Sequence, residues 1–413
     1  MKTFSQYIIN KLFEFRNHTK TYINETIEPI KIHENCNIIA IGDIHGDIQL
    51  MLDTLTIGGV IKQTYAEKKN AIKIIRKDIN DDVEYYKWIG GNTIVVQVGD
   101  QIDRCRPVNG KNCEDGNVTY SDEASDIEIL LFFTNLHEKA QLPKEEEKKG
   151  AVYSLLGNHE LMNICDSDIR YVSYKNLEQL KLKDKDEDEE INDEEINDEV
   201  KKIIKSEENE IDDYKQRRKN IFRRGGILAK FLASTRYSIL IVNNYLFVHG
   251  GVLGSYIKQY NYTEKKHFQD INNKIKNYII MKEDQELEQE IHPFIFGADS
   301  PFYTRILGQI EINKKIDDNS CKDIKELISD YNLEGIIVGH TPQTDGINGT
   351  CLNENKKTFF RIDVASSKAF YYLFKNNEQA QVQAQVLRIS NNDITEILKF
   401  ENGINGNIIS IKL

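Results

Sequence analysis

Five short apolar runs, rich in β-branched residues, each end in a glycine or histidine that opens a cluster of metal-ligand residue types. The runs and the motifs that follow them are 37–41 before GDIHGD, 93–98 before GDQIDR, 151–156 before GNHE, 245–248 before HGG and 335–338 before GHTP. Buried strands hide both faces in a covered sheet, and the loops at their carboxyl ends present polar side chains. The pattern therefore predicts an α/β fold in which five strand ends meet at one edge and converge on one site.

The residue types in these motifs indicate a metal site. Oxygen ligands from Asp and Asn, combined with imidazoles, suit borderline divalent ions such as Mn, Zn or Fe. A single Gly-Asp-x-His is most often a turn, and a single histidine after a strand is most often a structural residue. Five occurrences in order along one chain make coincidence a poor explanation.

The ordered series resembles the calcineurin-like metallophosphoesterases, specifically their phosphoprotein phosphatase branch. The later segments GHTPQ at 339–343, RID at 361–363 and SSKAF at 366–370 are similar to the bacterial, Shewanella-like serine/threonine protein phosphatases. The resemblance covers about residues 36–370, interrupted by insertions. It implies a single catalytic domain with the family's α/β/β/α sandwich, two sheets covered by helices on both outer faces, in place of the two or three domains that the length alone suggests.

The resemblance implies two divalent metal ions, expected to be manganese, with iron or zinc as alternatives. The implied ligands are Asp43, His45 and Asp100 for the first ion, and Asp100, Asn158, His249 and His340 for the second. A bridging carboxylate such as Asp100 suits two cations roughly 3.5–4 Å apart, and such a pair lowers the pKa of a bound water from about 15.7 toward roughly 7. The resulting hydroxide would attack phosphorus in line, without a phosphoenzyme.

The resemblance also assigns roles beside the metal ligands. His159 would be the general acid that protonates the leaving alkoxide, and Asp103 would orient its imidazole and favour the charged form. Arg104 would hold phosphate oxygens through a bidentate fork that Lys does not reproduce. Arg305 is the candidate for a second phosphate-binding arginine, with a surface salt bridge as the competing interpretation.

One position departs from the family pattern. The family normally has glycine after the arginine of the second motif, whereas this chain has Cys105, followed by an insertion. We expect the loop that carries Arg104 to sit differently, which bears on substrate preference more than on metal binding.

The predicted function is that of a metal-dependent phosphomonoester hydrolase, a serine/threonine protein phosphatase acting on a phosphoprotein. No cysteine is followed six positions later by arginine, as a cysteinyl-phosphate loop requires, and no Gly-x4-Gly-Lys-Ser/Thr is present. The alternative within the superfamily is a nucleotide hydrolase such as a dinucleoside polyphosphatase. Glu160 favours the protein phosphatases, because such hydrolases often carry Asp there. A non-catalytic phosphoprotein-binding module is a further alternative, against which the intact ligand set counts.

Charge is concentrated in one segment. The chain has 413 residues and a formal net charge of −12, and residues 184–199 alone contribute eleven acidic residues and one basic. The rest is near neutral, which disfavours a globally basic nucleic-acid binder. We interpret 184–213 as a solvated, low-complexity insertion, with an acidic docking segment for a basic partner as the alternative.

The remaining organisation follows from composition. Residues 1–35 are predicted to be a polar, partly helical extension before the catalytic domain at 36–413, with further insertions at 62–91 and 106–122. Residues 214–235 and 256–290 have helical spacing, and 359–364, 382–389 and 394–400 are predicted strands.

The sequence also predicts a cellular location. No window holds the roughly 18 apolar residues that a membrane helix needs, and 1–16 lacks the apolar centre of a signal peptide. Six scattered cysteines without a CxxC motif favour reduced thiols. We therefore expect a cytoplasmic protein with no membrane or nucleic-acid partner.

Overall fold

A computed structural model gives the arrangement of the chain. It describes residues 2–25, 28–33, 35–62, 71–80, 86–108, 110–143, 149–184, 214–262, 264–281, 285–374, 383–390, 395–401 and 407–413. The acidic segment 185–213 lies outside these residues, so its predicted character stays a prediction.

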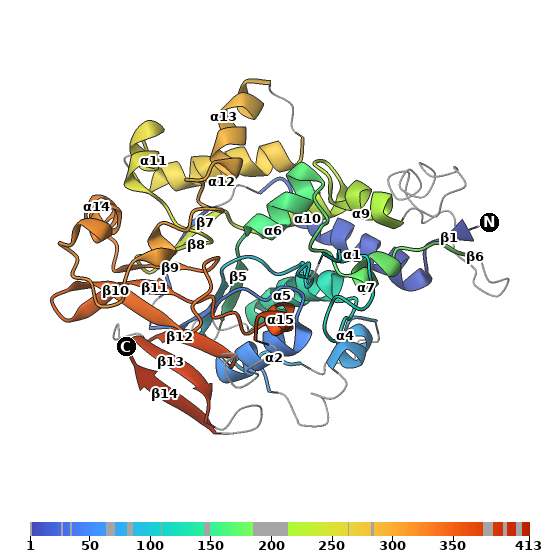
Figure 1. The fold of residues 1–413 in the computed structure, drawn as a ribbon, viewed down its shortest axis with the longest axis horizontal. Helices are drawn as coiled ribbons and strands as arrows, with labels where there is room; N and C mark the ends of the chain where they lie inside the picture. The colour runs from blue at the N-terminus through green and yellow to red at the C-terminus, as the bar shows by residue number, and fades with distance from the viewer. Residues whose placement is uncertain are drawn as a thin grey trace.

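Two six-stranded sheets form the centre of the molecule (Figure 1). The first has the order β14-β13-β12-β3-β4-β5, and the second has the order β10-β11-β9-β8-β7-β2. The strands of the first sheet are β3 (Ile38–Ile41), β4 (Ile94–Gln97), β5 (Ala151–Ser154), β12 (Gln385–Ile389), β13 (Thr395–Phe400) and β14 (Ile408–Lys412). Those of the second are β2 (Ile30–Lys31), β7 (Ile239–Val242), β8 (Tyr245–Val248), β9 (Gly335–Val338), β10 (Asn348–Asn353) and β11 (Lys356–Arg361). A two-residue pair, β1 (Lys2–Thr3) and β6 (Lys183–Asp184), stands apart.

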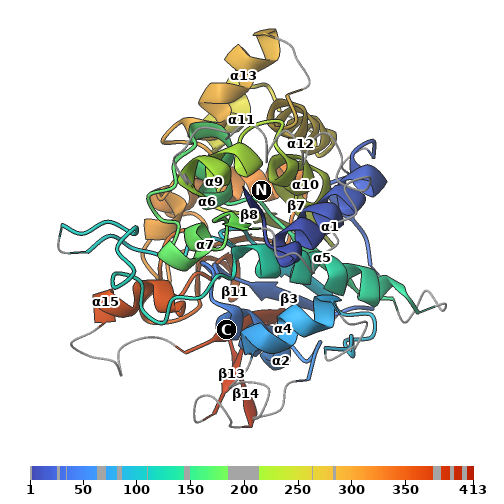
Figure 2. The same ribbon diagram turned by 90° about the vertical axis from the view of Figure 1, so that its right-hand side faces the viewer.

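Helices cover the outer face of each sheet, and Figure 2 shows α11, α12 and α13 at one end of the molecule with α2 and α4 at the opposite end. The helices of the chain's first half are α1 (Gln6–Tyr22), α2 (Ile48–Ile57), α4 (Ala71–Asn80), α5 (Asp126–Gln141), α6 (Asn158–Leu161) and α7 (Tyr174–Glu178). Those of the second half are α9 (Tyr214–Phe222), α10 (Ile227–Thr235), α11 (Gly254–Gln259), α12 (Lys266–Ile279), α13 (Gln285–Phe296), α14 (Lys322–Tyr331) and α15 (Tyr371–Phe374). The predicted α/β/β/α sandwich is confirmed.

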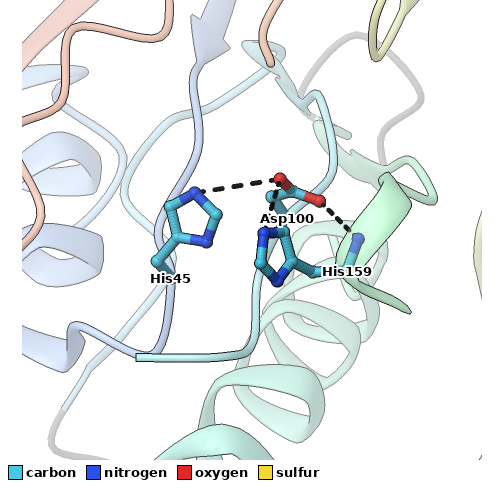
Figure 3. A group of neighbouring side chains, drawn as sticks. All are labelled: His45, Asp100 and His159. Atoms are coloured by element: carbon cyan, nitrogen blue, oxygen red, sulfur yellow. Dashed lines mark hydrogen bonds and ion pairs between the residues drawn. The ribbon is translucent and has the colours of Figure 1, made fainter. Parts of the chain in front are cut away.

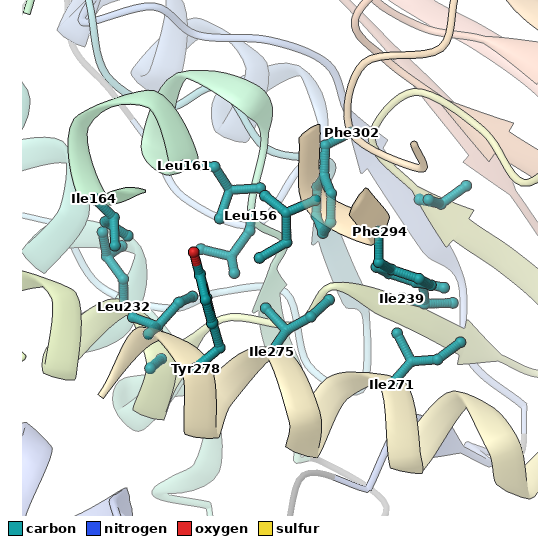
Figure 4. Packing of buried hydrophobic residues seen from close by; sticks show 14 of the residues in the cluster. Leu156, Leu161, Ile164, Leu232, Ile239, Ile271, Ile275, Tyr278, Phe294 and Phe302 are labelled. Atoms are coloured by element: carbon teal, nitrogen blue, oxygen red, sulfur yellow. The ribbon is translucent and has the colours of Figure 1, made fainter. Parts of the chain in front are cut away.

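Three apolar cores correspond to the three interfaces of this sandwich. The inward faces of β3, β4 and β5 meet those of β7, β8 and β9 between the sheets, through side chains such as Val96 and Phe247. Helices α2, α4 and α5 pack on the outer face of the first sheet. The largest core joins the second sheet to α10, α12 and α13, where Ile271, Ile275 and Tyr278 of α12 face Ile239 and Leu232 (Figure 4).

The N-terminal extension belongs to that large core. Helix α1 buries Ile8, Leu12 and Phe15, and the Phe15 ring meets the Phe231 ring of α10 edge-on at 4.6 Å. Since burying one such side chain stabilises a fold by about 1.5–3 kcal/mol, this helix is an integral part of the packing.

The predicted strands and helices are confirmed in type. Strands lie at all five apolar runs, and the helical stretch 214–235 divides into α9 and α10 around the Gly225-Gly226 pair. One expectation needs correction, because the five strand ends do not share one sheet edge. Strands β3, β4 and β5 pair in parallel in one sheet, whereas β8 and β9 pair in parallel in the other. Continuous apolar runs show that strands are buried but not which strands pair.

The prediction of reduced thiols is wrong for four of the six cysteines. Cys105 pairs with Cys113, and Cys321 pairs with Cys351. Their Cα atoms lie 5.8 and 5.7 Å apart, which is within the range that a disulfide requires. Cys36 and Cys165 are free. The result removes one argument for the predicted cytoplasmic location, which stays a prediction. Among the described residues, no helix has the length and apolar character to cross a membrane.

We predict that the Cys321–Cys351 disulfide stabilises the fold substantially. It closes a loop of 30 residues between the start of α14 and β10, for which the chain-entropy argument gives about 3–4 kcal/mol. A double variant, Cys321→Ala with Cys351→Ala, should lower the free energy of unfolding by about this amount in urea titrations without reductant. Cys36→Ala is the matched control at a free cysteine. An unchanged urea midpoint in the double variant would contradict the prediction.

Candidate metal centre

Each predicted ligand follows a strand and is carried on the turn that ends it. Asp43 and His45 follow β3, and Asp100 follows β4. Asn158 opens the short helix α6 after β5, at the start of a helical segment that continues as a π-helix over Met162–Asp166. His249 and His340 follow β8 and β9. Each of these six residues is at least nine-tenths buried.

The backbone at these turns bends through unusual conformations. His45, Asp100, Asp103 and His340 all have positive φ angles, between 46° and 70°. Such angles are uncommon for residues with a side chain, and they concentrate at functional sites where the surroundings enforce them. The strain is consistent with loops shaped to aim ligands inward.

Glu160 is the group that holds the Asp100 turn in place. One of its carboxylate oxygens accepts hydrogen bonds from the backbone N–H of Asp100 at 3.0 Å and of Gly157 at 2.7 Å, and the other accepts from Gln101 at 2.8 Å. The side chain is fully buried. The glutamate of the GNHE motif therefore ties the ends of β4 and β5 together, a role that sequence reasoning missed.

Two glycines let these loops approach closely. A Cβ atom at Gly157 would lie 2.2 Å from Oδ1 of Asp100, and one at Gly339 would lie 2.3 Å from Oδ1 of Asp43. Both distances are far below van der Waals contact. Alanine at either position would push a metal-ligand carboxylate out of place.

Asp100 lies at the meeting point of the ligands. Its Oδ2 is 3.8 Å from Nε2 of His45, 3.3 Å from Nε2 of His249 and 3.9 Å from Nε2 of His159. Its Oδ1 accepts a hydrogen bond from the backbone N–H of His159 at 2.9 Å. Figure 3 shows His45 and His159 on either side of this carboxylate.

The ligand atoms fall into two groups that share Asp100. One group is His45, Asp100 and His159, and the other is Asp100, His249 and His340. Asp43 joins the first group, with Oδ2 at 3.8 Å from Nε2 of His45. Asn158 joins the second, with Oδ1 at 3.0 Å from Nε2 of His249. The structure thus brings all six sequence-predicted ligands together.

Backbone carbonyls orient the three ligand histidines. Nδ1 of His249 faces the carbonyl of Val98 at 2.8 Å, Nδ1 of His45 faces that of Ile102 at 3.4 Å, and Nε2 of His340 faces that of Tyr303 at 3.0 Å. Because a carbonyl only accepts, each of these ring nitrogens must donate. The opposite nitrogen of each ring is then the one that can bind a cation, as is usual for metal-bound histidine.

The electrostatics of the cluster fit divalent cations. Burial, followed by the charge of Asp363, raises the pKa of Asp43 well above its usual range. Burial opposes ionisation of Asp100 as well, but the charges of His249 and His159 hold the pKa of Asp100 well below its usual range. Burial would lower the pKa of His249, yet Asp100 raises it to about 10. His249 must release its Nε2 proton before that nitrogen can bind a cation, and the cation then supplies the positive charge that the proton gave.

Two further ligands keep a free lone pair. Burial and then the charge of His249 lower the pKa of His340 to about 3, and burial and then the charge of Arg106 lower the pKa of His45 well below its usual range. Both rings are neutral near pH 7 and can bind a metal. Oδ2 of the buried Asp363 has no hydrogen-bond partner among the described residues. The donor set of carboxylates, an amide oxygen and neutral imidazoles suits Mn, Fe or Zn.

His159 and Asp103 form a buried pair beside the ligands. Nδ1 of His159 lies 2.9 Å from Oδ2 of Asp103, and Asn163 donates to both oxygens of the same carboxylate at 3.1 and 3.0 Å. This arrangement leaves Nε2 of His159 facing Asp100 and the cleft. The predicted orienting contact between Asp103 and His159 is present.

A cleft of about 400 Å³ opens over the ligands. Its lining includes His45, Asp100, Asn158, His159, His340, Asp363, Met162, Asp166, Asp168, Tyr171, Tyr303, Pro342 and Phe370, with Arg106, Arg170 and Arg305. The predicted Arg305 is therefore in the cleft, whereas the predicted Arg104 is not among its lining residues. Arg106 and Asp363 are cleft residues that sequence reasoning missed, although 361–363 lay in a segment that carried the resemblance.

A family model described as calcineurin-like phosphoesterase matches residues 36–344, most of the chain and every ligand named above. The chain belongs to the calcineurin-like phosphoesterase family. It is a hydrolase of the metallophosphoesterase type, and the predicted family is confirmed.

Two relatives are similar to this chain over much of its length. An uncharacterized protein of Acanthamoeba polyphaga mimivirus is 30% identical over 280 residues, which cover 65% of this chain and 98% of that protein. Shewanella-like protein phosphatase 2 of Arabidopsis thaliana is 26% identical over 354 residues, covering 80% of this chain and 71% of that protein.

The fold has a counterpart among solved structures. The cold-active protein-tyrosine phosphatase of a psychrophilic Shewanella superposes with a TM-score of 0.56 at 16% identity, covering 94% of this chain and 83% of that chain. This likeness supports the sandwich fold.

We predict that Asp100→Asn reduces metal binding itself. The change removes the shared negative charge and places amide hydrogens where cations would lie. After incubation with Mn²⁺ and desalting, the metal content measured by elemental analysis should fall from about two ions per chain to one or fewer. Asp168→Asn, a cleft carboxylate paired with Arg170, is the control that should retain metal. Full occupancy in Asp100→Asn would refute the shared role.

Proposed function

We propose that this protein is a metal-dependent phosphomonoester hydrolase that acts on phosphoproteins, as a serine/threonine protein phosphatase with a dinuclear metal centre. The observation that carries the proposal is the position of the Asp100 carboxylate, shared by two groups of ligands and adjacent to the His159–Asp103 pair. The name of the Arabidopsis relative supports a protein substrate.

The ligand roles follow the two groups. Asp43, His45 and Asp100 would hold one cation, and Asn158, His249 and His340 would hold the other together with Asp100. When bound, two divalent cations would neutralise phosphate charge and acidify a water molecule for in-line attack. His159 also lies in the first of these groups, and we assign it to proton transfer rather than to ligation because the family resemblance implies a general acid at this position.

His159 would supply the proton that the leaving alkoxide needs. Its Nδ1–H is donated to Asp103, which fixes the orientation of the ring, so the proton for transfer would sit on Nε2. Asn163 in turn holds the Asp103 carboxylate, and its own Oδ1 accepts from Nε of the buried Arg218 at 3.1 Å. This chain of contacts keeps the acid aimed at the cleft.

We predict that His159→Asn retains metal but loses about 10²–10⁴ in kcat, the usual contribution of a general acid. Metal content by elemental analysis and turnover of a phosphopeptide would be measured on the same preparation. His267→Asn, a histidine at the start of α12, is the control outside the cleft. Turnover at the wild-type rate in His159→Asn would disprove the assignment.

The substrate class is tested by Mn²⁺-dependent phosphate release. Matched phosphoserine, phosphothreonine and phosphotyrosine peptides would be compared with diadenosine tetraphosphate, using Asp100→Asn as the inactive control. We expect turnover of the phosphoserine and phosphothreonine peptides. Turnover confined to phosphotyrosine would change the residue preference, and turnover confined to the dinucleotide would replace the protein substrate by a nucleotide. Binding of a phosphopeptide without turnover would indicate a non-catalytic module.

The acidic segment 184–199 bears on which partner proteins this chain would bind. Because its charge is dense and of one sign, a basic partner is the class of protein that it would attract.

A further inference from the structure

Arg104, the arginine of the second motif, makes its hydrogen bonds away from the cleft through Nη1 and Nη2, while its Nε has no partner among the described residues. Its side chain is 1% exposed. Nη1 donates to the carbonyl of Gly46 at 2.8 Å and to Glu123 at 2.9 Å, and Nη2 donates to the carbonyl of Ser121 at 2.9 Å. Asp47 lies 3.8 Å from the same guanidinium. Its charge is thus balanced by two carboxylates of the fold, and its donors face protein rather than the cleft.

Arg106, two residues later, has its guanidinium at the cleft, unlike Arg104. It lines the cleft, and its guanidinium carbon lies 4.8 Å from the centre of the Phe370 ring and 5.4 Å from that of Tyr171. Nη1 donates to the carbonyls of Asp103 and Cys105 at 3.0 and 2.8 Å. Within the described part of the chain, no carboxylate forms a salt bridge with it. The rings fix the plane of the guanidinium while Nε and Nη2 stay available to an anion.

The loop geometry explains why Arg106 reaches the cleft. Cys105, which replaces the family's glycine, is bonded to Cys113, and its backbone N–H donates to the carbonyl of Tyr171 at 2.9 Å. These two bonds anchor the loop immediately before Arg106. Arg106 acts electrostatically on the candidate metal ligands. After burial, its charge is the largest cause that lowers the pKa of His45.

Arg305 approaches the cleft from the other sheet. Its Nη1 donates to the carbonyl of His340 at 3.0 Å, and no described carboxylate pairs with it. Arg170, the third arginine of the cleft, differs because Nη2 lies 2.6 Å from Asp168. Two cleft arginines, one beside each group of ligands, therefore carry unbalanced positive charge.

We propose that Arg106 and Arg305 are the phosphate-binding arginines of this site and that Arg104 is a structural residue. The proposal rests on the proposed function, because it assigns the groups that hold the phosphate of the same substrate. A planar guanidinium can offer two parallel donors to phosphate oxygens, as lysine cannot. The anchoring of Arg106 by a disulfide and two rings reduces the entropy lost when the phosphate binds.

The test measures binding of inorganic phosphate to the Mn²⁺-loaded full chain by calorimetry, with its inhibition constant against p-nitrophenyl phosphate as a second readout. Arg106→Gln should weaken phosphate binding roughly 10- to 100-fold, the range for hydrogen bonds to a charged group, and raise KM by a similar factor. Arg106→Lys should recover only part of the loss, because a single ammonium cannot form the fork.

Two variants separate the roles. Arg170→Gln should bind phosphate within about threefold of wild type, since Asp168 already balances that charge. Arg104→Gln should mainly lower the melting temperature, because Glu123 loses its ion-pair partner and the carbonyls of Gly46 and Ser121 lose a charged donor. Wild-type phosphate affinity in Arg106→Gln would overturn the proposal, as would lost phosphate affinity in an Arg104→Gln protein that melts at the wild-type temperature.

The outcome is distinguishable from a failure of the proposed function. A wild-type protein that binds phosphate through Arg106 but hydrolyses no phosphopeptide would support the phosphate-binding residues and refute the protein substrate. A metal-loaded wild-type protein that binds no phosphate would overturn the assignment of Arg106 and Arg305.

Discussion

The structure depends most on how one buried carboxylate is held. Asp100 touches ligands from both sheets, since His45 follows β3 of the first sheet and His249 follows β8 of the second. A buried charge is costly unless it is paired and hydrogen-bonded, and here the compensation comes from His249, from the His159 backbone and from whatever cations the site binds. The two sheets must therefore meet at this residue for the charge to be tolerated, and the sandwich provides that meeting point.

The surrounding contacts show how a fold keeps such a cluster in place. Glu160 gathers the amides of the Asp100 turn, and backbone carbonyls select which nitrogen of each ligand histidine faces inward. Neither feature touches a phosphate, yet both decide where the ligand atoms lie. The positive φ angles of His45, Asp100 and His340 belong to the same arrangement, because the packed sheets enforce turns that the residues alone disfavour.

The departure from the family pattern at Cys105 is local. It leaves all six predicted metal ligands together, while the arginine of the second motif points into the protein and the next arginine reaches the cleft. Metal binding depends on strand ends that the sheets fix, whereas the arginine position depends on a loop that a disulfide can redirect. A change in the loop can thus alter how substrate is held without disturbing the metal centre.

The sequence by itself determined the elements, the family and the candidate ligand residues that the fold brings together, because strands, turns and residues of metal-ligand type are encoded in short contiguous motifs such as GDIHGD and GNHE. It also indicated that the Arg104 loop would sit differently, since Cys105 stands where a glycine is usual. Only the tertiary structure decided how the strands divide between two sheets, which cysteines pair, and which arginine faces the cleft. These properties depend on contacts between residues that are distant along the chain, as Cys321 and Cys351 are, or on the direction of one side chain. Neither leaves a periodic or local signal in the sequence.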